Sequence, residues 1–358
     1  MININLELQF DTIKWLRFPL IIGIVFIHNN MVLPTSVECS PWVIEVVNLF
    51  GDVIPRICVP LFFIISGYLF FLNLENTHKA YIAKIHRRFY TLFLPYLLWN
   101  SIAFILLILF GNISISNISH QWTYLLNVFF DFRGGMPANF PMWFIRDLLM
   151  LVLIAPVIKT LLCTTRGLIL ILFLLLWFME VPWLNMLPRC SSILFFMAGA
   201  FLSIHNINLL KPSFFGGRIF IILYPLFAIV DLITKESFYH SYFHKIGVIL
   251  GILMVLYIVP ILIKKKKFRF IFKFEDMSFF VFGAHALFIY RLTSLIHKVI
   301  NPQNPYLLLF LYFFVGLFTV FVCCCSCYIL RRFIPTLSAV LEGNFFKKSL
   351  IVKKMSQK

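Results

Sequence analysis

Two ionisable side chains in the first long apolar segment are the strongest candidates for chemistry. Arg17 and His28 are separated by ten residues. At about 100° and about 1.5 Å per residue, a helix places them on one face within about 20°, with His28 roughly 16 Å further along. Imidazole titrates near neutral pH, so it can take a proton from a hydroxyl. We expect His28 to act as a general base. Each residue also has a structural alternative to a functional role. The Arg17 side chain could extend to the lipid headgroups, and His28 could form a hydrogen bond to a neighbouring helix.

Two further apolar segments carry polar groups. RICVPLFFIISGYLFF contains Ser66, Gly67 and Tyr68. Because glycine permits close backbone approach in membrane helices, a packing notch at Ser66-Gly67 is the alternative to substrate contact. MSFFVFGAHALFIYRL contains His285, for which a structural or acceptor-side role and a catalytic role both stay open.

A basic run, KAYIAKIHRRFY, precedes the third apolar segment. Its cations Lys84, Arg87 and Arg88 lie within one and a half helical turns. Clustered cations are suited to phosphate groups. We expect this run to bind a phosphate-rich ligand on the cytoplasmic side.

His240 and His244 have the i, i+4 spacing of metal ligands, but the sequence shows no third ligand or Glu with them. We therefore interpret them as part of a solvated loop. The eight Cys residues also lack metal-binding spacing. No metal site is predicted.

These residues belong to a chain with the composition of a membrane protein. Of its 358 residues, 61% are hydrophobic and 13% charged, against about 45 to 50% and about 25% in soluble domains. The apolar residues extend over the whole chain, which excludes a soluble globular enzyme. We expect an all-α, polytopic integral membrane protein with about ten transmembrane helices. The predicted spans are 13–33, 53–72, 91–111, 142–162, 167–184, 190–205, 218–234, 245–263, 277–297 and 306–330.

The distribution of the basic residues predicts the topology. The net charge is +17, and most Lys and Arg fall on one side if the N-terminus is cytoplasmic, as the positive-inside rule requires. Both termini are then cytoplasmic. Topology and contact with anionic membrane lipid account for the basic charge, so no nucleic-acid partner is expected. We expect one transmembrane domain over 1–335 and a short basic cytoplasmic tail over 336–358. The aromatic outer segment 112–141 is a candidate cover for an outward-facing cavity.

Several of these segments together resemble the acyltransferase type-three family of integral membrane sugar O-acyltransferases. The matching features are Arg17 with His28, VPLFFIISGYLF, the basic run into TLFLPYLLWN, PMWFIRDLL and SFFVFGAHALF. Their order and spacing match over the first four spans and again at the ninth.

The resemblance implies transfer of an acyl group, commonly acetyl, from coenzyme A in the cytoplasm to a hydroxyl of an envelope glycan or lipid-linked saccharide. It implies a multi-pass protein of the bacterial inner membrane. Acyl-CoA is then a donor substrate, and no permanently bound cofactor is expected.

The resemblance also implies roles for individual residues. His28 matches the catalytic histidine, and Arg17 matches an arginine that acts with it or with the donor. The family's arginine pair before the third span is matched by Lys84 and Arg87, with Arg88 adjacent, and lysine lacks the bidentate fork. The remaining candidates, for substrate binding, are Ser66, Tyr68, Trp143 and His285.

Two other functions fit the same residues. A transporter or flippase of a lipid-linked saccharide or small acid would use Arg17, His28 and His285 for substrate binding or proton relay. Missing repeats and uninterrupted spans weigh against it. The other large class of membrane-bound O-acyltransferases also uses an intramembrane histidine. The position of His28 in the first span argues against that class.

Overall fold

The computed structural model describes residues 5–29, 40–110, 122–131, 135–181, 187–300 and 304–344, and these residues form helices and connections without a strand. The helices are α1 (Leu6–Ile27), α2 (Pro41–Asn48), α3 (Cys58–Phe71), α4 (His78–Arg88), α5 (Leu94–Leu109), α6 (Trp122–Phe129), α7 (Trp143–Leu153), α8 (Ala155–Thr164), α9 (Leu168–Phe178), α10 (Cys190–Ile204), α11 (Lys211–Gly216), α12 (Ile219–Ile233), α13 (His240–Lys264), α14 (Ser278–Val299), α15 (Pro305–Phe333) and α16 (Pro335–Leu341). Short π- and 3-10 turns join or extend several of them, namely η2 (Leu49–Val53), η3 (Pro55–Ile57), η4 (Phe89–Phe93), η6 (Phe140–Met142) and η8 (Arg269–Met277).

Among the described residues, five helices are long and apolar enough to cross a membrane: Pro41–Phe71, His78–Leu109, His240–Lys264, Arg269–Val299 and Pro305–Phe333. The pair α7 and α8, bent by 64°, makes a sixth if it is one span. The protein is therefore a multi-pass, all-helical membrane protein, as predicted. The number ten is not supported by this measure, because α9, α10 and α12 are shorter apolar helices. Helix α1 also falls outside the five, since Asp11, Lys14 and Arg17 interrupt its apolar residues.

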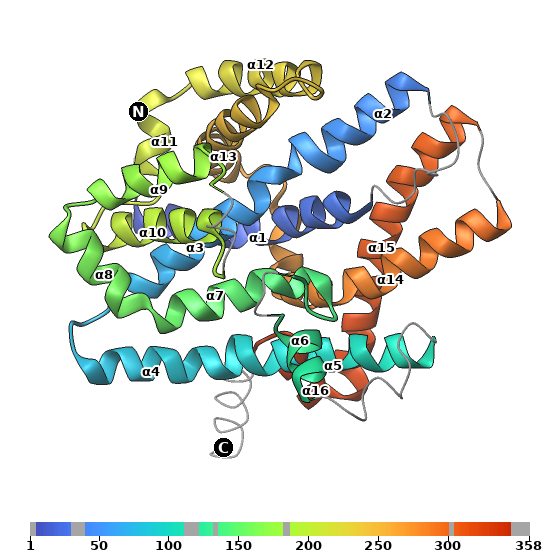
Figure 1. Ribbon diagram of the computed structural model, residues 1–358, viewed down its shortest axis with the longest axis horizontal. Coiled ribbons are helices and arrows are strands. Elements are labelled where there is room, and N and C mark those ends of the chain that lie inside the picture. Colours follow the sequence, from blue (N-terminus) through green and yellow to red (C-terminus); the bar gives the residue numbers. More distant parts are fainter. Residues whose placement is uncertain are drawn as a thin grey trace.

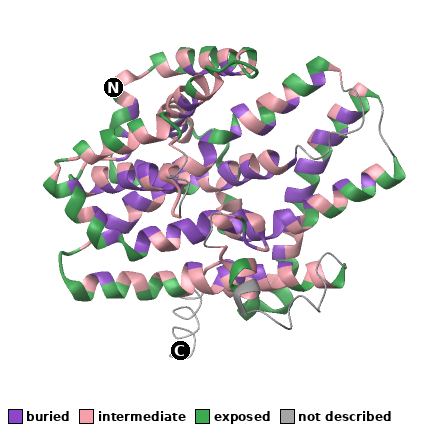
Figure 2. Cartoon of the chain, viewed as in Figure 1, coloured by how far each residue is buried: buried purple, intermediate pink, exposed green. Residues whose placement is uncertain are grey.

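Helix α1 lies in the middle of the molecule, while α4 and α5 run end to end along its lower edge and α14 and α15 occupy the right side (Figure 1). Helix α1 contacts α3, α13, α14 and α15. Figure 2 shows buried residues concentrated on the central helices, whereas the outer helices α4 and α12 carry mostly intermediate and exposed residues. Because neighbours enclose it, α1 holds its polar side chains in fixed positions inside the bundle.

Helices α3 and α10 cross at glycines. A Cβ atom on Gly67 would overlap the carbonyl oxygen of Phe196, and one on Gly199 would overlap that of Ile64. These are backbone atoms, which cannot move aside cheaply. Gly67 therefore forms the packing notch that was one of the two interpretations of Ser66-Gly67.

We expect Gly67→Ala to lower membrane yield and the thermal transition of the purified protein. Overpacking of this kind costs about 1 to 3 kcal/mol. Gly247→Ala is the matched control, because a Cβ atom there meets nothing within 4 Å. Equal stability of the two variants would contradict the close α3–α10 contact.

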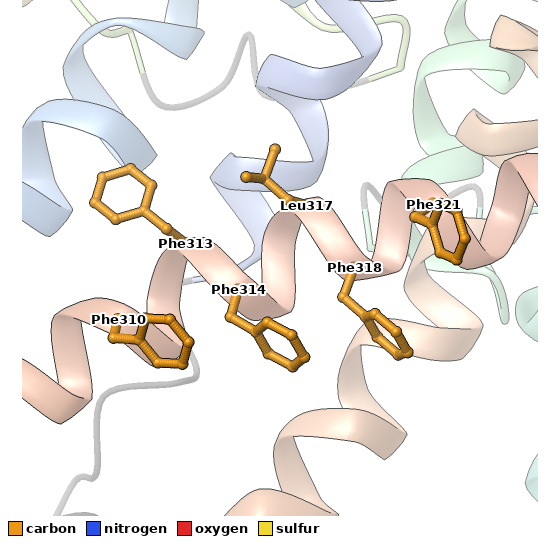
Figure 3. A pocket seen from close by; sticks show the side chains of 6 residues that line it. All are labelled: Phe310, Phe313, Phe314, Leu317, Phe318 and Phe321. Atoms are coloured by element: carbon orange, nitrogen blue, oxygen red, sulfur yellow. The ribbon is translucent and has the colours of Figure 1, made fainter.

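One face of α15 carries a ladder of aromatic side chains, shown in Figure 3. Phe310, Phe314 and Phe318 follow one another with ring centroids 5.8 and 5.2 Å apart. With Phe313, Leu317 and Phe321 they line a shallow apolar surface. In a membrane protein such a surface suits contact with lipid chains.

The first part of the segment expected as a tail forms α16, which packs against α5 and α15. The indole nitrogen of Trp99 donates to the carbonyl oxygen of Leu341 at 3.1 Å. Arg331 and Glu342 form an ion pair at 2.8 Å. Residues 345–358 lie outside the described part of the chain.

Candidate active site

Two cavities lie along one face of α1. Arg17, Ile21 and Ile24 contribute to a cavity of about 640 Å³, which we call the basic cavity. Ile24, Ile27 and His28 contribute to a second cavity of about 500 Å³, which we call the His28 cavity. The spacing of these residues repeats every three or four positions, as one helix face requires. The structure thus places Arg17 and His28 on a common face, as the sequence predicted.

The two cavities share part of their lining. Ile24 of α1, Phe144 of α7 and Phe282 of α14 line both. All three side chains are hydrophobic. The basic and His28 cavities therefore meet at an apolar wall built from three helices.

The basic cavity brings together Arg17, Lys84, Arg87 and Arg88, the cations that the sequence singled out. Lys84 donates from Nζ to the carbonyl oxygens of Phe70 and Leu72 at the end of α3, so part of its bonding capacity holds α4 to α3. Among the described residues, none of the four cations forms an ion pair with a carboxylate. Their charges are therefore available to an anionic ligand.

Three carboxylates, Glu275, Asp276 and Glu342, line other parts of the basic cavity. Burial opposes ionisation of Glu342, but hydrogen bonds from Arg331 and Ser338 outweigh it and hold the pKa of this carboxyl below its usual value. Glu342 is therefore ionised at neutral pH and bound to Arg331. It does not neutralise the four cations of the cavity.

His28 follows the last residue of α1 and is half-buried. Its ring lies nearly perpendicular to the ring of Phe140, with centroids 4.4 Å apart. On another side the ring of His285 lies nearly parallel to it, with centroids 5.5 Å apart. The structure thus brings the two predicted intramembrane imidazoles together.

His285 is fully buried, and its Nδ1 lies 2.7 Å from the carbonyl oxygen of Phe282 and 3.2 Å from that of Val281. A ring nitrogen between two carbonyl oxygens must donate a proton, which leaves Nε2 as an acceptor in the neutral ring. Nε2 has no hydrogen-bond partner among the described residues. This arrangement provides an acceptor beside His28, and the role of His285 in substrate binding stays a prediction.

Phe140 is positioned by a buried asparagine that the sequence analysis missed. The backbone N–H of Asn139 donates to Oδ1 of Asn100 at 3.0 Å, and its Nδ2 donates to the carbonyl oxygen of Gly283 at 2.8 Å. These bonds fix η6 between α5 and α14. The only signal in the sequence was that Asn139 and Phe140 directly precede the PMW motif.

The residues that line the His28 cavity include Trp143, Arg189 and Lys245. The guanidinium carbon of Arg189 lies 3.9 Å from the ring centroid of Trp143. Lys245 pairs with Glu180 at 2.7 Å, and Ser241 donates to the same carboxylate. Arg189 and Lys245 come from distant parts of the chain, so no local pattern connects them with Trp143.

Arg146 and Asp147 have structural partners. Arg146 is 2% exposed and donates from Nη1 to the carbonyl oxygens of Phe130, Asp131 and Gly135 at 2.7 to 3.0 Å. It thus holds residues 130, 131 and 135 against α7. Residues 112–121 and 132–134 of the segment expected to cover a cavity lie outside the described residues.

Ser66 and Tyr68 of α3 lie in different surroundings. Ser66 lines the basic cavity. Tyr68 is 2% exposed and is not among the residues that line the basic or the His28 cavity. Substrate contact by Ser66 and by Tyr68 stays a prediction.

The interpretation of His240 and His244 as a solvated loop is wrong. Both residues belong to the first turns of α13. Asp231 of α12, which is buried, lies beside both imidazoles. The third ligand-type residue is therefore present, but 9 residues before His240 in the sequence.

The fold and its paired cavities define a multi-pass membrane protein with a histidine inside the bundle. The chain belongs to the acyltransferase type-three family, whose model, described as an acyltransferase domain, matches residues 10–329. It is thus a membrane-bound O-acyltransferase, as its motifs predicted.

A curated relative matches almost the full chain. The succinoglycan biosynthesis protein ExoH of Rhizobium meliloti (strain 1021) is 27% identical over an alignment 353 positions long, and this alignment covers 93% of this chain and 91% of the relative. No solved structure matches the chain.

Proposed function

We propose that this enzyme transfers an acyl group, most commonly acetyl, from cytoplasmic acyl-CoA to a hydroxyl of a cell-envelope polysaccharide or its lipid-linked precursor. The observation that carries the proposal is the end-to-end arrangement of the basic cavity and the His28 cavity along α1. The name of the relative, which places that protein in the biosynthesis of a polysaccharide, supports a carbohydrate acceptor.

The donor enters through the basic cavity. Its phosphates contact Arg17, Arg87 and Arg88, because guanidinium groups bind phosphate oxygens through charge-assisted hydrogen bonds. Lys84 adds charge while it holds α4 to α3. The uncharged pantetheine arm extends toward the apolar wall, where it presents the thioester to His28.

The acceptor enters the His28 cavity from the opposite side. His28 removes the proton of the sugar hydroxyl as its oxygen attacks the thioester carbonyl carbon. The new C–O bond forms, the C–S bond breaks, and His28 returns the proton to the leaving thiolate. Trp143, Ser66 and His285 line or adjoin the path and are the proposed contacts for acceptor and thioester.

This scheme uses the topology that the basic residues predict. The basic cavity opens toward the cytoplasm, with both termini on that side of a bacterial inner membrane, and the His28 cavity opens outward. Residues 1–335 form the transmembrane catalytic domain and 336–358 the cytoplasmic segment that follows it. Acyl-CoA is consumed as a substrate, and no cofactor stays bound.

The test is a reaction with purified enzyme, radiolabelled acetyl-CoA and envelope oligosaccharide. We expect label in the oligosaccharide and one free thiol per transferred group, because the C–S bond must break. A transporter or flippase would move saccharide without thiol release. Thiol release that does not depend on saccharide, or saccharide movement without it, would contradict the proposal.

A further inference from the structure

The ends of α12 and α13 bring three ligand-type side chains together. Asp231 lies near the end of α12, and His240 and His244 lie one turn apart at the start of α13. Nδ1 of His240 is 3.1 Å from Oδ1 of Asp231, and Nδ1 of His244 is 2.8 Å from Oδ2. One donor atom from each residue lies within 4.8 Å of the other two. This spacing suits a single bound ion.

The contact between Asp231 and His240 is close but is not a hydrogen bond. Oδ1 of Asp231 and Nδ1 of His240 are both buried and have no hydrogen-bond partner among the described residues. Asp231 is only 2% exposed. Nδ1 of His244 is hydrogen-bonded to Oδ2 of Asp231, so only Oδ1 of this buried carboxylate is left without a partner. A buried carboxylate oxygen is costly unless it is hydrogen-bonded or coordinates a metal. The unpartnered carboxylate oxygen and imidazole nitrogen are thus a second indication, beyond residue type, that a ligand belongs between them.

The donor atoms are nitrogen and oxygen, as in zinc sites. Donor atoms at about 2.0 Å from a zinc ion are separated by about 3.3 Å. Here the imidazole nitrogens of His240 and His244 lie 3.1 and 2.8 Å from the two different oxygens of Asp231. Two imidazoles and one carboxylate are also a common donor set for zinc, with a fourth position left for water. Ca²⁺ and Mg²⁺ instead prefer ligands that are all oxygen.

We propose that Asp231, His240 and His244 form a binding site for a divalent transition metal ion of the zinc type. The ion joins α12 to α13 across residues 234–239. The ion also fixes the start of α13. There, Ser241 and Lys245 bind Glu180, which lines the His28 cavity. The site therefore stabilises one wall of that cavity. This inference does not depend on the proposed acyl transfer.

The charged groups around the site are compatible with a dication. Asp52 lies in η2, which contacts α12, and pairs with Arg56 and with Lys235 at 3.8 Å. These two cations are thus already matched to a carboxylate of their own. Asp231 supplies the charge that faces the ion.

The test measures metal content and thermal stability of the full-length protein in detergent. After dialysis against ZnCl₂ and removal of free ion, we expect about one zinc per chain. We also expect a zinc-dependent rise of the thermal transition that a chelator reverses. His240→Ala and Asp231→Asn should each lose the bound zinc and the rise.

His78→Ala is the control, because His78 is exposed on α4 and away from the cluster. It should bind zinc as the wild type does. His240 is the most exposed of the three ligands, so His240→Ala is the variant expected to fold, and its elution profile checks this. Substoichiometric zinc in the wild type, or equal zinc in the wild type and in folded His240→Ala, would overturn the proposal.

Discussion

His28→Ala is expected to abolish measurable acyl transfer while the amount of protein in the membrane stays unchanged. Positioned general acid–base groups contribute about a hundredfold to ten-thousandfold to a rate. His28 lines its cavity and is half-buried, so its removal leaves space without breaking a buried hydrogen bond that the structure records. The measurement is the initial rate of label transfer from acetyl-CoA at saturating acceptor.

His78→Ala is the matched control for this loss, because it removes an exposed imidazole outside both cavities. It should transfer acyl groups at the wild-type rate. Full transfer by His28→Ala would remove this residue from the mechanism. Donor binding by the inactive variant should persist, since the cations of the basic cavity are untouched.

The double substitution Arg87→Ala with Arg88→Ala is expected to raise KM for acyl-CoA about a hundredfold, with a smaller effect on kcat. A hydrogen bond to a charged group contributes about 1.5 kcal/mol or more, which corresponds to about tenfold per contact. Both side chains line the basic cavity, and neither forms an ion pair with a carboxylate of the described residues. Wild-type donor binding should also weaken as salt is added, because ions screen exposed charges.

Lys79→Ala is the control for this variant, since Lys79 is an exposed cation on the same helix that does not line the basic cavity. A second comparison uses acetyl-pantetheine, which lacks the nucleotide phosphates. The double variant and the wild type should use it equally well. If the double variant loses as much with acetyl-pantetheine as with acetyl-CoA, the two arginines do not act on the phosphates.

The common face of Arg17 and His28 was predictable because a regular helix fixes it. Helix α1 is continuous from Leu6 to Ile27, so the spacing of 11 residues translates directly into direction. The basic run was predictable for the same local reason, since Arg87 and Arg88 are adjacent on one helix. The all-helical membrane class followed from composition alone.

The rest of the site depends on tertiary contacts that no local pattern contains. Asp231 reaches His240 because α12 and α13 pack as neighbours, and Arg189 reaches Trp143 from a separate connection. The number of membrane spans could not be predicted from the pattern of apolar residues either. Hydropathy reports the length of an apolar segment and does not measure the 64° bend between α7 and α8.

The wall of Ile24, Phe144 and Phe282 has a consequence for the energy balance of the cell. A protein with a continuous water-filled path through the bilayer would dissipate the ion gradients that drive transport and ATP synthesis. Hydrocarbon side chains exclude hydrated ions, because an ion that sheds its water there gains nothing in return. The pantetheine arm of the proposed donor carries no charge, so its passage between such side chains costs far less than that of an ion. In the proposed mechanism, the same three residues therefore keep ions from crossing the membrane while the acyl group passes between the two cavities.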